Sequence, residues 1–347
     1  MAKVLSKVKS YLKYVVSLLI AGGLLWYIFK DFELSTLLEK MRQVDYSWVA
    51  LAILIFILSH SLRAYRWNLM LKPLGYRHLT TFRTLLAVMI GYFANLIVPR
   101  MGEVSRCGVL KKTDAVPVTT SLGTVVAERV VDLGCLFLST VLLVFLEFER
   151  LNEFIFSFFE GKLSSLGQNV FAIYVLGALV ALGILIFYMF GQAIKKRVMH
   201  NKFFGKIRMF VREMLNGLTS IGRVEKLGVF LATTVMIWVC YFLMSYVVFF
   251  SLPETSELTW RAGLAVLVMG SFGMAAPVQG GFGTFHALVS GVLLLYGIAE
   301  QEGVLFATLI HSMQTVSFIL FGGISFFIAS VVATRKELPQ HKEKSSA

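Results

Sequence analysis

The sequence predicts an all-α polytopic membrane protein, built as two inverted repeats that each hold three transmembrane helices and one re-entrant broken helix. Three observations support this prediction: the apolar composition, the uneven distribution of charge among the loops, and two apolar segments interrupted by helix breakers. Hydrophobic residues make up 57% of the 347 residues and charged residues 15%, whereas an ordinary soluble domain carries about 25% charged residues. The composition therefore indicates an integral membrane protein.

Apolar runs that predict transmembrane helices recur along the chain, since a spanning helix needs about 20 mostly apolar residues. They lie at 11–29, 48–62, 120–146, 169–190, 228–250 and 304–333. The first run follows four lysines but continues through Trp26 and Phe29 into Lys30 without a small-residue cleavage site. We interpret it as a signal anchor rather than a cleaved signal peptide. The whole chain, 1–347, is predicted to be one membrane domain.

Loop charges set the predicted orientation. The net charge is +13, and the cations lie in short loops between apolar runs, as expected for loops retained on the inner side of a membrane. This distribution excludes nucleic acid as the partner. The loops 30–45 and 147–168 are acid-rich and predicted to be external, whereas the linker 191–227 and the tail 334–347 are basic and predicted to be cytoplasmic. A further cytoplasmic loop is predicted from the cations after the second run, namely Arg63, Arg66, Lys72, Arg77 and Arg83. Both termini are then cytoplasmic, in the cell (inner) membrane.

The first interrupted segment is 84–110, which contains the stretch NLIVPRMGEVSR, Asn95 to Arg106. Its halves, 84–95 and 103–112, would form helices of about 18 and 15 Å at about 1.5 Å per residue, and neither crosses a hydrocarbon core of about 30 Å. If this segment crossed the membrane, the nine cations of the linker would be external, against the positive-inside bias. Loop charge thus favours a re-entrant hairpin, with one kinked helix as the alternative.

The second interrupted segment lies in the apolar run 262–297, where MAAPVQGGFGTFHA (Met274 to Ala287) contains one proline and three glycines. Acidic residues flank the run on both sides, so it is predicted to enter and leave from outside. The two halves, about 11–147 and 169–333, then each hold three membrane crossings. Because three is odd, the second half starts on the opposite side of the membrane and is inverted relative to the first. Interrupted helices at corresponding positions of inverted repeats mark a substrate site near the midplane of transporters. The linker is predicted to include an amphipathic interfacial helix.

Six ionisable residues lie in or beside these predicted membrane segments: Arg100, Glu103, Arg106, Glu128, Arg129 and Asp132. Each would cost about 2.5–3.5 kcal/mol at a helix centre, so we expect them to neutralise one another. Glu128 and Asp132 are four residues apart and share a helix face, and Arg129 can reach Asp132 at a spacing of three. One interpretation is a closed ion-pair network that ties the hairpin to the next span.

The other interpretation is a binding site for an anionic headgroup. Arg100 lies in the break, where non-helical backbone is tolerated at membrane depth only if protein or a watery cavity surrounds it. A guanidinium there suits bidentate contact with phosphate, and the first amides of the next half-helix add positive potential. The candidate headgroup-binding residues are Arg100, Arg129, Arg106 and Asn95, with Glu103, Glu128 and Asp132 as the charge network and Pro99 and Gly102 as helix breaks.

The second break carries no charge. Its helix breakers are Pro277, Gly280, Gly281 and Gly283, and the glycines permit close approach of the backbone. His286 is either a pH-sensitive or phosphate-facing group or a packed, neutral histidine. His311 and Gln314 lie three residues apart on the last span, in positions similar to those of Arg129 and Asp132 in the first half.

Taken together, three motifs resemble those of a known family. They are N-x-x-x-P-R-x-G-E-x-x-R from Asn95, E-R-x-x-D from Glu128 and P-x-x-G-G-x-G from Pro277. They resemble the lysylphosphatidylglycerol synthase transmembrane region family, which is the flippase-like domain of the multiple peptide resistance factor and its stand-alone relatives. The resemblance covers about 10–333 and implies a domain that moves phospholipids between leaflets. Full-length members add a soluble aminoacyl-transferase domain, which a chain of this length is not expected to contain. The chain departs from the family pattern at Gln279, where a second proline is common, and at His286, where an acid is common.

The sequence therefore predicts flippase- or scramblase-like translocation of an anionic phospholipid or lipid-linked precursor across the inner membrane. Membrane phospholipids are the predicted partners, and a homo-oligomer and a separate lipid-synthesising enzyme stay open as further partners. The motifs GxxxxGK[ST], GxSxG, HExxH and CxxC are not found, so no catalytic residue, metal site or cofactor is predicted. Two alternatives stay open. One is a membrane-embedded lipid-modifying enzyme of the phosphatidylglycerol lysyltransferase type, with Glu103, Glu128 or Asp132 in acid–base catalysis. The other is a transporter of a small anion.

Overall fold

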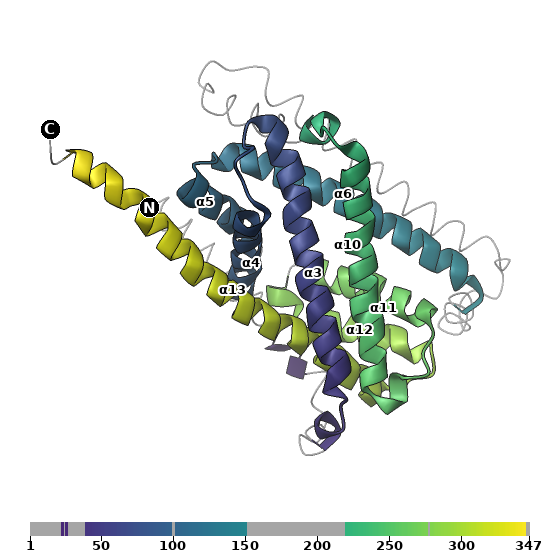
Figure 1. The fold of residues 1–347 in the computed structure, drawn as a ribbon. Helices are drawn as coiled ribbons and strands as arrows, with labels where there is room; N and C mark the ends of the chain where they lie inside the picture. Colours follow the sequence, from purple (N-terminus) through teal and green to yellow (C-terminus); the bar gives the residue numbers. More distant parts are fainter. Residues whose placement is uncertain are drawn as a thin grey trace, which may run out of the picture.

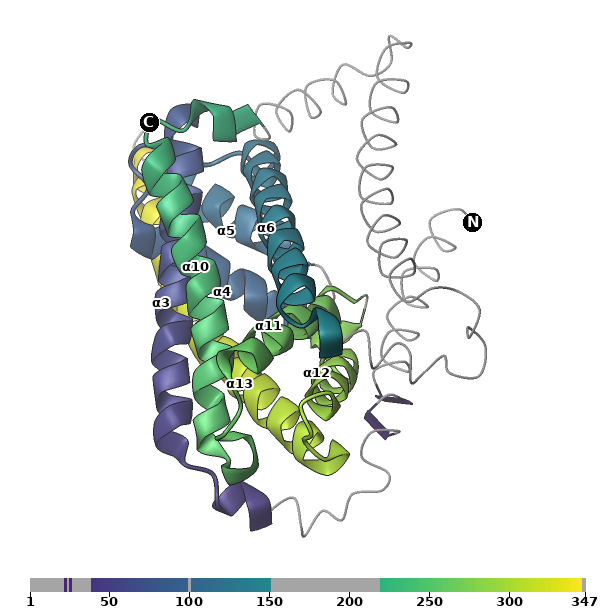
Figure 2. The ribbon, with the colours of Figure 1, turned by 90° about the vertical axis from the view of Figure 1, so that its right-hand side faces the viewer.

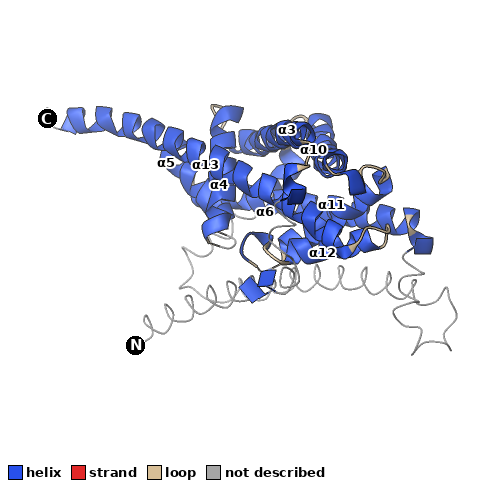
Figure 3. Cartoon of the chain, turned by 90° about the horizontal axis from the view of Figure 1, so that it is seen from below, coloured by secondary structure: helices blue, strands red, loops and turns tan. Residues whose placement is uncertain are grey.

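A computed structural model describes residues 39–98, 101–150, 219–276 and 278–344, together with residues 22, 23, 25 and 26. These segments consist of α-helices and short 3-10 helices and contain no strand (Figure 3). The all-α class is therefore confirmed. Most of the predicted span 11–29, the span 169–190 and the predicted interfacial helix lie outside the described residues.

Four described segments are long and apolar enough to cross a membrane, and they confirm four of the predicted runs. They are built on α3 (Tyr46–Leu71), α6 (Val118–Leu146), α10 (Leu227–Val247) and α13 (Glu300–Lys344). Helices α3 and α10 pack side by side and run in opposite directions (Figure 2). Helix α13 runs obliquely across the bundle (Figure 1).

Helix α3 is longer than its apolar run predicts. It begins after Asp45, whose side chain accepts a hydrogen bond from Ser47 N at 2.9 Å and so satisfies one free amide of the first turn. It ends where the 3-10 turn η1 (Lys72–Leu74) brings in a proline, which cannot continue the hydrogen-bond ladder. Arg63 and Arg66 therefore lie inside the helix, and their prediction as cytoplasmic loop residues was wrong.

The first interrupted segment forms a helical hairpin, hairpin one, made of α4 (Thr81–Ile97) and α5 (Gly102–Asp114). Arg83, near the start of α4, forms an ion pair with Asp114 at the end of α5. The two helices are therefore antiparallel, which excludes the alternative of one kinked helix. Pro99 and Arg100, at the tip, lie outside the described residues.

Small residues bring the two arms of hairpin one together near its tip. A Cβ added at Gly91 would lie 2.8 Å from Gly102 O, and one added at Gly102 would lie 2.6 Å from Asn95 Nδ2. Asn95 Oδ1 in turn accepts a hydrogen bond from Gly102 N at 2.6 Å, which satisfies an amide at the start of α5. Close packing and this hydrogen bond fix the tip.

The second interrupted segment forms a similar hairpin, hairpin two, from α11 (Trp260–Ala275), the short turn η6 (Gln279–Gly281) and α12 (Thr284–Leu294). A Cβ added at Gly273 would lie 2.6 Å from Phe285 Cα. Thr284 Oγ1 donates to Gly273 O at 2.8 Å. The same two devices, a close-packed glycine and a side-chain hydrogen bond, thus close this tip as well.

The two tips touch each other. Gln279 Nε2, from hairpin two, donates to Leu96 O at 2.7 Å and to Ile97 O at 3.1 Å, both at the end of α4. Helix geometry leaves such terminal carbonyls without a partner inside the helix. Hairpin two therefore supplies the hydrogen bonds that end the first arm of hairpin one.

Charged residues gather at two opposite ends of the bundle. At one, the acidic end, Lys40 pairs with Glu302 and lies 3.7 Å from Glu254, and the hydrogen bond to Glu302 raises the pKa of the Lys40 ammonium. At the other, the basic end, Arg77 pairs with Glu225 just before α10. The segments that loop charge assigns to one side of the membrane thus meet at one end of the molecule.

The remaining short helices lie at these two ends. They are η3 (Thr219–Arg223) at the basic end, and η4 (Val248–Ser251) and η5 (Pro253–Thr255) at the acidic end. The order of long helix, hairpin and long helix occurs twice, as α3, hairpin one, α6 and then α10, hairpin two, α13. An inverted repeat predicts this order, and a symmetry relation between the halves stays a prediction.

Helix α6 exposes a broad apolar face. The large apolar side chains concerned are Val130, Leu133, Phe137, Leu138, Val141, Leu142 and Phe145. Contiguous apolar surface of this kind is rare on soluble monomers. A multi-pass membrane protein, in which lipid covers such a face, accounts for it.

Candidate functional site

The centre of the candidate site is Glu128 on α6, which is fully buried among three guanidinium groups. Its Oε1 lies 2.5 Å from Arg63 Nη2 and 3.4 Å from Arg66 Nη2, and its Oε2 lies 3.1 Å from Arg106 Nη2. The arginines come from α3 and α5. A buried carboxylate needs such partners, since an isolated charge inside a low-dielectric interior is strongly unfavourable.

Asp132 lies one turn further along α6 and binds the same two arginines of α3. Its oxygens are 2.7 Å from Arg63 Nη2 and 2.7 Å from Arg66 Nη2. The prediction that Glu128 and Asp132 share a helix face is confirmed. We refer to these two carboxylates and their arginines Arg63, Arg66 and Arg106 as the buried cluster.

Arg129 does not contact Asp132, so that predicted pair was wrong. Its neighbour Glu128 faces α3, and one step along a helix turns the next side chain by about 100°. Arg129 instead reaches hairpin one, where its Nη2 lies 3.0 Å from Glu103 Oε1. This ion pair is partly open, with 43% and 28% of the two side chains exposed, and it ties α6 to the first turn of α5.

The sequence analysis missed Arg63 and Arg66, which are central to the cluster. The side chain of Arg63 is 3% exposed and that of Arg66 is fully buried. The signal that could have found them is the stretch WNLML, which follows Arg66 directly. Apolar residues on both sides of two cations, three apart, predict a helix that continues past them. Their spacing of three residues and the four-residue spacing of the carboxylates on α6 each place both side chains on one helix face.

Helix α10 completes the enclosure of these two arginines. Arg63 Nη1 donates to Tyr241 Oη at 2.9 Å, and Arg66 Nη1 donates to Thr234 Oγ1 at 3.4 Å. The buried cluster thus connects helices from both halves of the chain: α3, α5 and α6 from the first half, and α10 from the second.

Arg106 is held differently from the arginines of α3. Its guanidinium carbon lies 4.6 Å from the centre of the Trp67 ring, a cation–π contact, and Trp67 Nε1 donates to Thr124 Oγ1 at 2.8 Å. Among the described atoms, Arg106 Nη2 makes no hydrogen bond of good geometry, although Glu128 is close. This guanidinium, a strong donor, belongs to α5 of hairpin one and is held by the ion pair and by the Trp67 ring.

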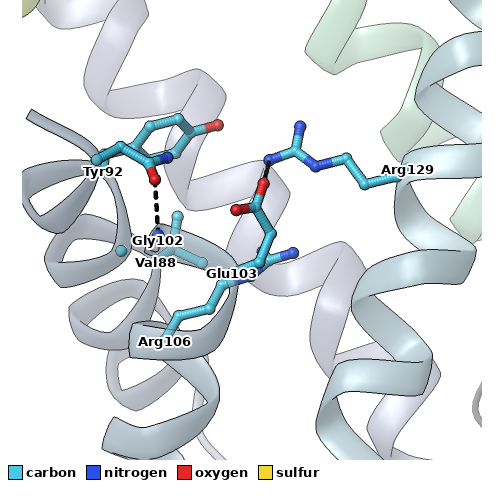
Figure 4. A pocket seen from close by; sticks show the side chains of 8 residues that line it. Val88, Tyr92, Gly102, Glu103, Arg106 and Arg129 are labelled. Atoms are coloured by element: carbon cyan, nitrogen blue, oxygen red, sulfur yellow. Dashed lines mark hydrogen bonds and ion pairs between the residues drawn. The ribbon is translucent and has the colours of Figure 1, made fainter. Parts of the chain in front are cut away.

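A small hollow opens next to this donor, between hairpin one and α6 (Figure 4). The room inside it is about 10 Å³, enough for about one water molecule. Its lining residues are Val88, Gly91, Tyr92, Asn95, Gly102, Glu103, Arg106 and Arg129. Three predicted headgroup-binding residues, Asn95, Arg106 and Arg129, thus line one hollow. The fourth, Arg100, lies outside the described residues.

The site carries more positive than negative charge. Four arginines, Arg63, Arg66, Arg106 and Arg129, contact three carboxylates, Glu103, Glu128 and Asp132. Among the described residues of the site, one positive charge is left over. An anion is the ligand that would balance it.

The predicted residues of the second half assemble around the tip of hairpin two. Gly280, Gly281 and Gly283 all have positive φ, so glycine is required there, while Pro277 lies outside the described residues. His311 Nε2 lies 2.9 Å from Gly280 O, and since a carbonyl only accepts, this nitrogen carries the proton. His286 is packed against the His311 ring, with the centroids 5.0 Å apart, and Gln314 lies on the same helix as His311, partly buried.

Among the described residues, no group of three or more His, Cys, Asp or Glu residues could hold a metal ion. Cys107, Cys135 and Cys240 are unpaired. The arrangement suits electrostatic binding of an anion.

The chain matches a known family over most of its length. The model of the family described as "Lysylphosphatidylglycerol synthase TM region" matches residues 14–322, which include both hairpins and the buried cluster. The chain belongs to this family.

Among the relatives, a UPF0104 membrane protein of Pyrococcus horikoshii is 24% identical over 332 residues, 91% of this chain and 96% of the relative. A UPF0104 membrane protein of Methanocaldococcus jannaschii is 29% identical over 140 residues, 39% of this chain and 40% of the relative. The glycosyltransferase AglD of Haloferax volcanii is 33% identical over 100 residues, 28% of this chain but 16% of that protein. The matches to the last two therefore span less than half of those proteins. No solved structure matches this chain.

Proposed function

We propose that the protein moves an anionic phospholipid or lipid-linked precursor between the leaflets of the cell membrane, with its termini on the cytoplasmic side. This proposal rests on the hollow, which lies beside a site with one unbalanced positive charge. Arg106 and Arg129 both line this hollow, and a guanidinium suits bidentate binding of phosphate. Both hairpins would enter the bilayer and return, which places their tips at membrane depth.

The ion pair between Arg129 and Glu103 is the part of the site that a ligand can rearrange. Its side chains are partly exposed, and exposed pairs contribute only about 0–1 kcal/mol. A lipid phosphate can therefore compete with Glu103 for Arg129. Glu128 differs, because it is enclosed by three arginines and serves to hold Arg106 at the edge of the hollow.

The outer face of α6 offers a place for the lipid tails. Val130 and Leu133 are exposed one and four residues after Arg129, so apolar surface begins directly beside the hollow. A lipid headgroup would enter between hairpin one and α6 only when the Arg129–Glu103 pair opens, while its acyl chains stay in the bilayer. A small water-soluble anion would gain nothing from this surface, which favours a lipid over the small-anion alternative.

The lipid-modifying enzyme is the second candidate, because one relative is named a glycosyltransferase. Acid–base catalysis needs a carboxyl group that can exchange a proton with the substrate. Each carboxylate of the site is engaged by at least one arginine of the chain, so none has both oxygens free to face a substrate. The geometry therefore supports translocation better than chemistry, and a separate enzyme would make the lipid.

Reconstitution into vesicles tests the proposal. The purified protein is placed in liposomes with a fluorescent phosphatidylglycerol or a fluorescent phosphatidylcholine, and a membrane-impermeant reductant reports which molecules reach the outer leaflet. We expect faster flipping of the phosphatidylglycerol and a loss of at least tenfold in Arg106→Gln. Arg77→Gln is the matched control, since Arg77 is 73% exposed, pairs with Glu225 at the basic end and does not line the hollow.

Three results would count against the proposal. Equal rates for both lipids would remove the role of the unbalanced charge. A new lipid species on thin-layer chromatography of the same vesicles would favour an enzyme, and uptake of a soluble anion without lipid movement would favour a small-anion transporter.

A further inference from the structure

The contact between the two hairpin tips joins residues that lie far apart in the sequence. Gln279 is separated by 183 residues from Leu96 and by 182 from Ile97, yet its one amide nitrogen reaches both of their carbonyl oxygens. A side-chain amide nitrogen carries two protons, so one side chain can serve two acceptors. The contact is therefore a complete two-point attachment between the tips.

The backbone on both sides of the contact is held in place. Gly280, the next residue, has a positive φ, and its carbonyl oxygen contacts His311 on α13. On the other side, Asn95 directly precedes Leu96, lines the hollow and holds the first turn of α5. Gln279 thus connects the frame of α13 to the tip that borders the hollow.

The attachment of the two tips by Gln279 can open. It consists of two neutral hydrogen bonds, and the side chain of Gln279 is only partly buried. Opening it separates neutral groups only, whereas opening the buried cluster would leave separated charges inside the protein.

We propose that Gln279 is a latch between the two hairpin tips, and that a headgroup passes only when this latch opens. The inference rests on the proposed function and adds the regulation of the same site. A headgroup that moves past both tips must separate them, and domain or hairpin separation of this kind is the usual basis of alternating access. Glutamine at this position also gives the tip a donor that proline lacks.

The test measures the separation of the tips directly. Spin labels are attached to cysteines introduced at Ile97 and Ala275, which are exposed on hairpin one and hairpin two, in a protein whose Cys107, Cys135 and Cys240 are serine. We expect Gln279→Met, which keeps the length of the side chain and removes the donor, to broaden the distance distribution towards longer distances. Gln301→Met is the matched control, since Gln301 is exposed at the start of α13.

A second measurement uses the same two cysteines without spin labels. A short bis-maleimide reagent links the tips covalently, and we expect the flipping rate of the anionic lipid to fall at least tenfold. An unchanged distance distribution in Gln279→Met would overturn the latch, and so would full flipping by the cross-linked protein. If the unmodified protein flips no lipid but Gln279→Met still separates the tips, the proposed function fails and the attachment of the hairpins by Gln279 stands.

Discussion

The two hairpins are built by the same rules and carry different chemistry. Each has a glycine packed against the opposite arm, a side-chain hydrogen bond at the tip, and a contact from the long helix that follows it. In hairpin one that contact is the ion pair from Arg129 to Glu103, and in hairpin two it is the hydrogen bond between His311 and the Gly280 carbonyl.

Because of this difference, the two hairpins can have different roles. An ion pair that is partly exposed can exchange one partner for an anion from outside, whereas a hydrogen bond to a backbone carbonyl offers an anion no positive charge. Hairpin one can therefore recognise a headgroup, while hairpin two acts on hairpin one through Gln279. The comparison gives four predictions, ordered here by the size of the expected effect on stability.

The largest effect is expected from Glu128→Gln in the buried cluster. The substitution leaves three buried arginines with less compensation, and removal of one partner from such a pair costs about 3–5 kcal/mol. Thermal unfolding in a single detergent measures the change. Glu225→Gln, at a carboxylate 56% exposed that pairs with Arg77, should change stability by less than about 0.5 kcal/mol. Equal effects of the two substitutions would contradict the structural importance of the cluster.

Alanine at the close-packed glycine should damage both hairpins to a similar degree. Gly102→Ala and Gly273→Ala each place a Cβ against backbone or polar atoms of the opposite arm, and overpacking of this kind costs about 1–3 kcal/mol. Gly108→Ala is the control on α5, where nothing lies within 4 Å, and it should be neutral or stabilising because alanine favours helix. A large effect in only one hairpin would show that their packing differs.

His311→Phe should loosen hairpin two by about 1 kcal/mol. The ring keeps its stacking on Phe285, but the Gly280 carbonyl loses its donor, and an unpaired acceptor that is partly buried lies at the low end of the usual cost. Because the lost bond is neutral, the effect should not depend on salt. Unfolding measured at two ionic strengths checks this, and a strong salt dependence would point to a charged histidine instead.

Glu103→Gln should have the smallest effect on stability, and it should strengthen the binding of an anionic lipid. The pair with Arg129 is partly exposed and worth about 0–1 kcal/mol, so the protein should unfold at nearly the same temperature. Freed from its partner, Arg129 should bind an anionic lipid more tightly. Binding of short-chain phosphatidylglycerol to Glu103→Gln and to the parent protein measures this, and weaker binding by the variant would argue against competition.

Loop charge predicted the arrangement of the hairpins well, because that rule depends on local composition. Arg83 lies near the start of the first arm of hairpin one and Lys111 near the end of the second, and these cations indicated that both ends lie on the same side. The structure places Arg83 beside Asp114. The glycines of the second break were predicted to permit close approach of the backbone, and a Cβ added at Gly281 would lie 2.6 Å from Met274 Sδ.

The contacts within the site could not be read from the sequence in the same way. Arg63 and Arg66 followed the end of an apolar run, and only the packing of α3 against α6 shows that their partners lie in the interior. The role of Gln279 was also hidden, because its partners are backbone carbonyls, which every residue carries. Both cases depend on which helices are neighbours, and local patterns do not contain that information.

The burial of Arg66 has a consequence for the order of events during synthesis. Its partner Asp132 lies 66 residues later in the chain, and at about 5–20 residues per second a ribosome needs roughly 3–13 s to make that stretch. During this interval the two cations of α3 lack the carboxylates of α6 that pair with them in the folded protein. The end of α3 must therefore wait near the membrane surface or within the insertion machinery until α6 emerges, so these two helices enter the bilayer as a pair.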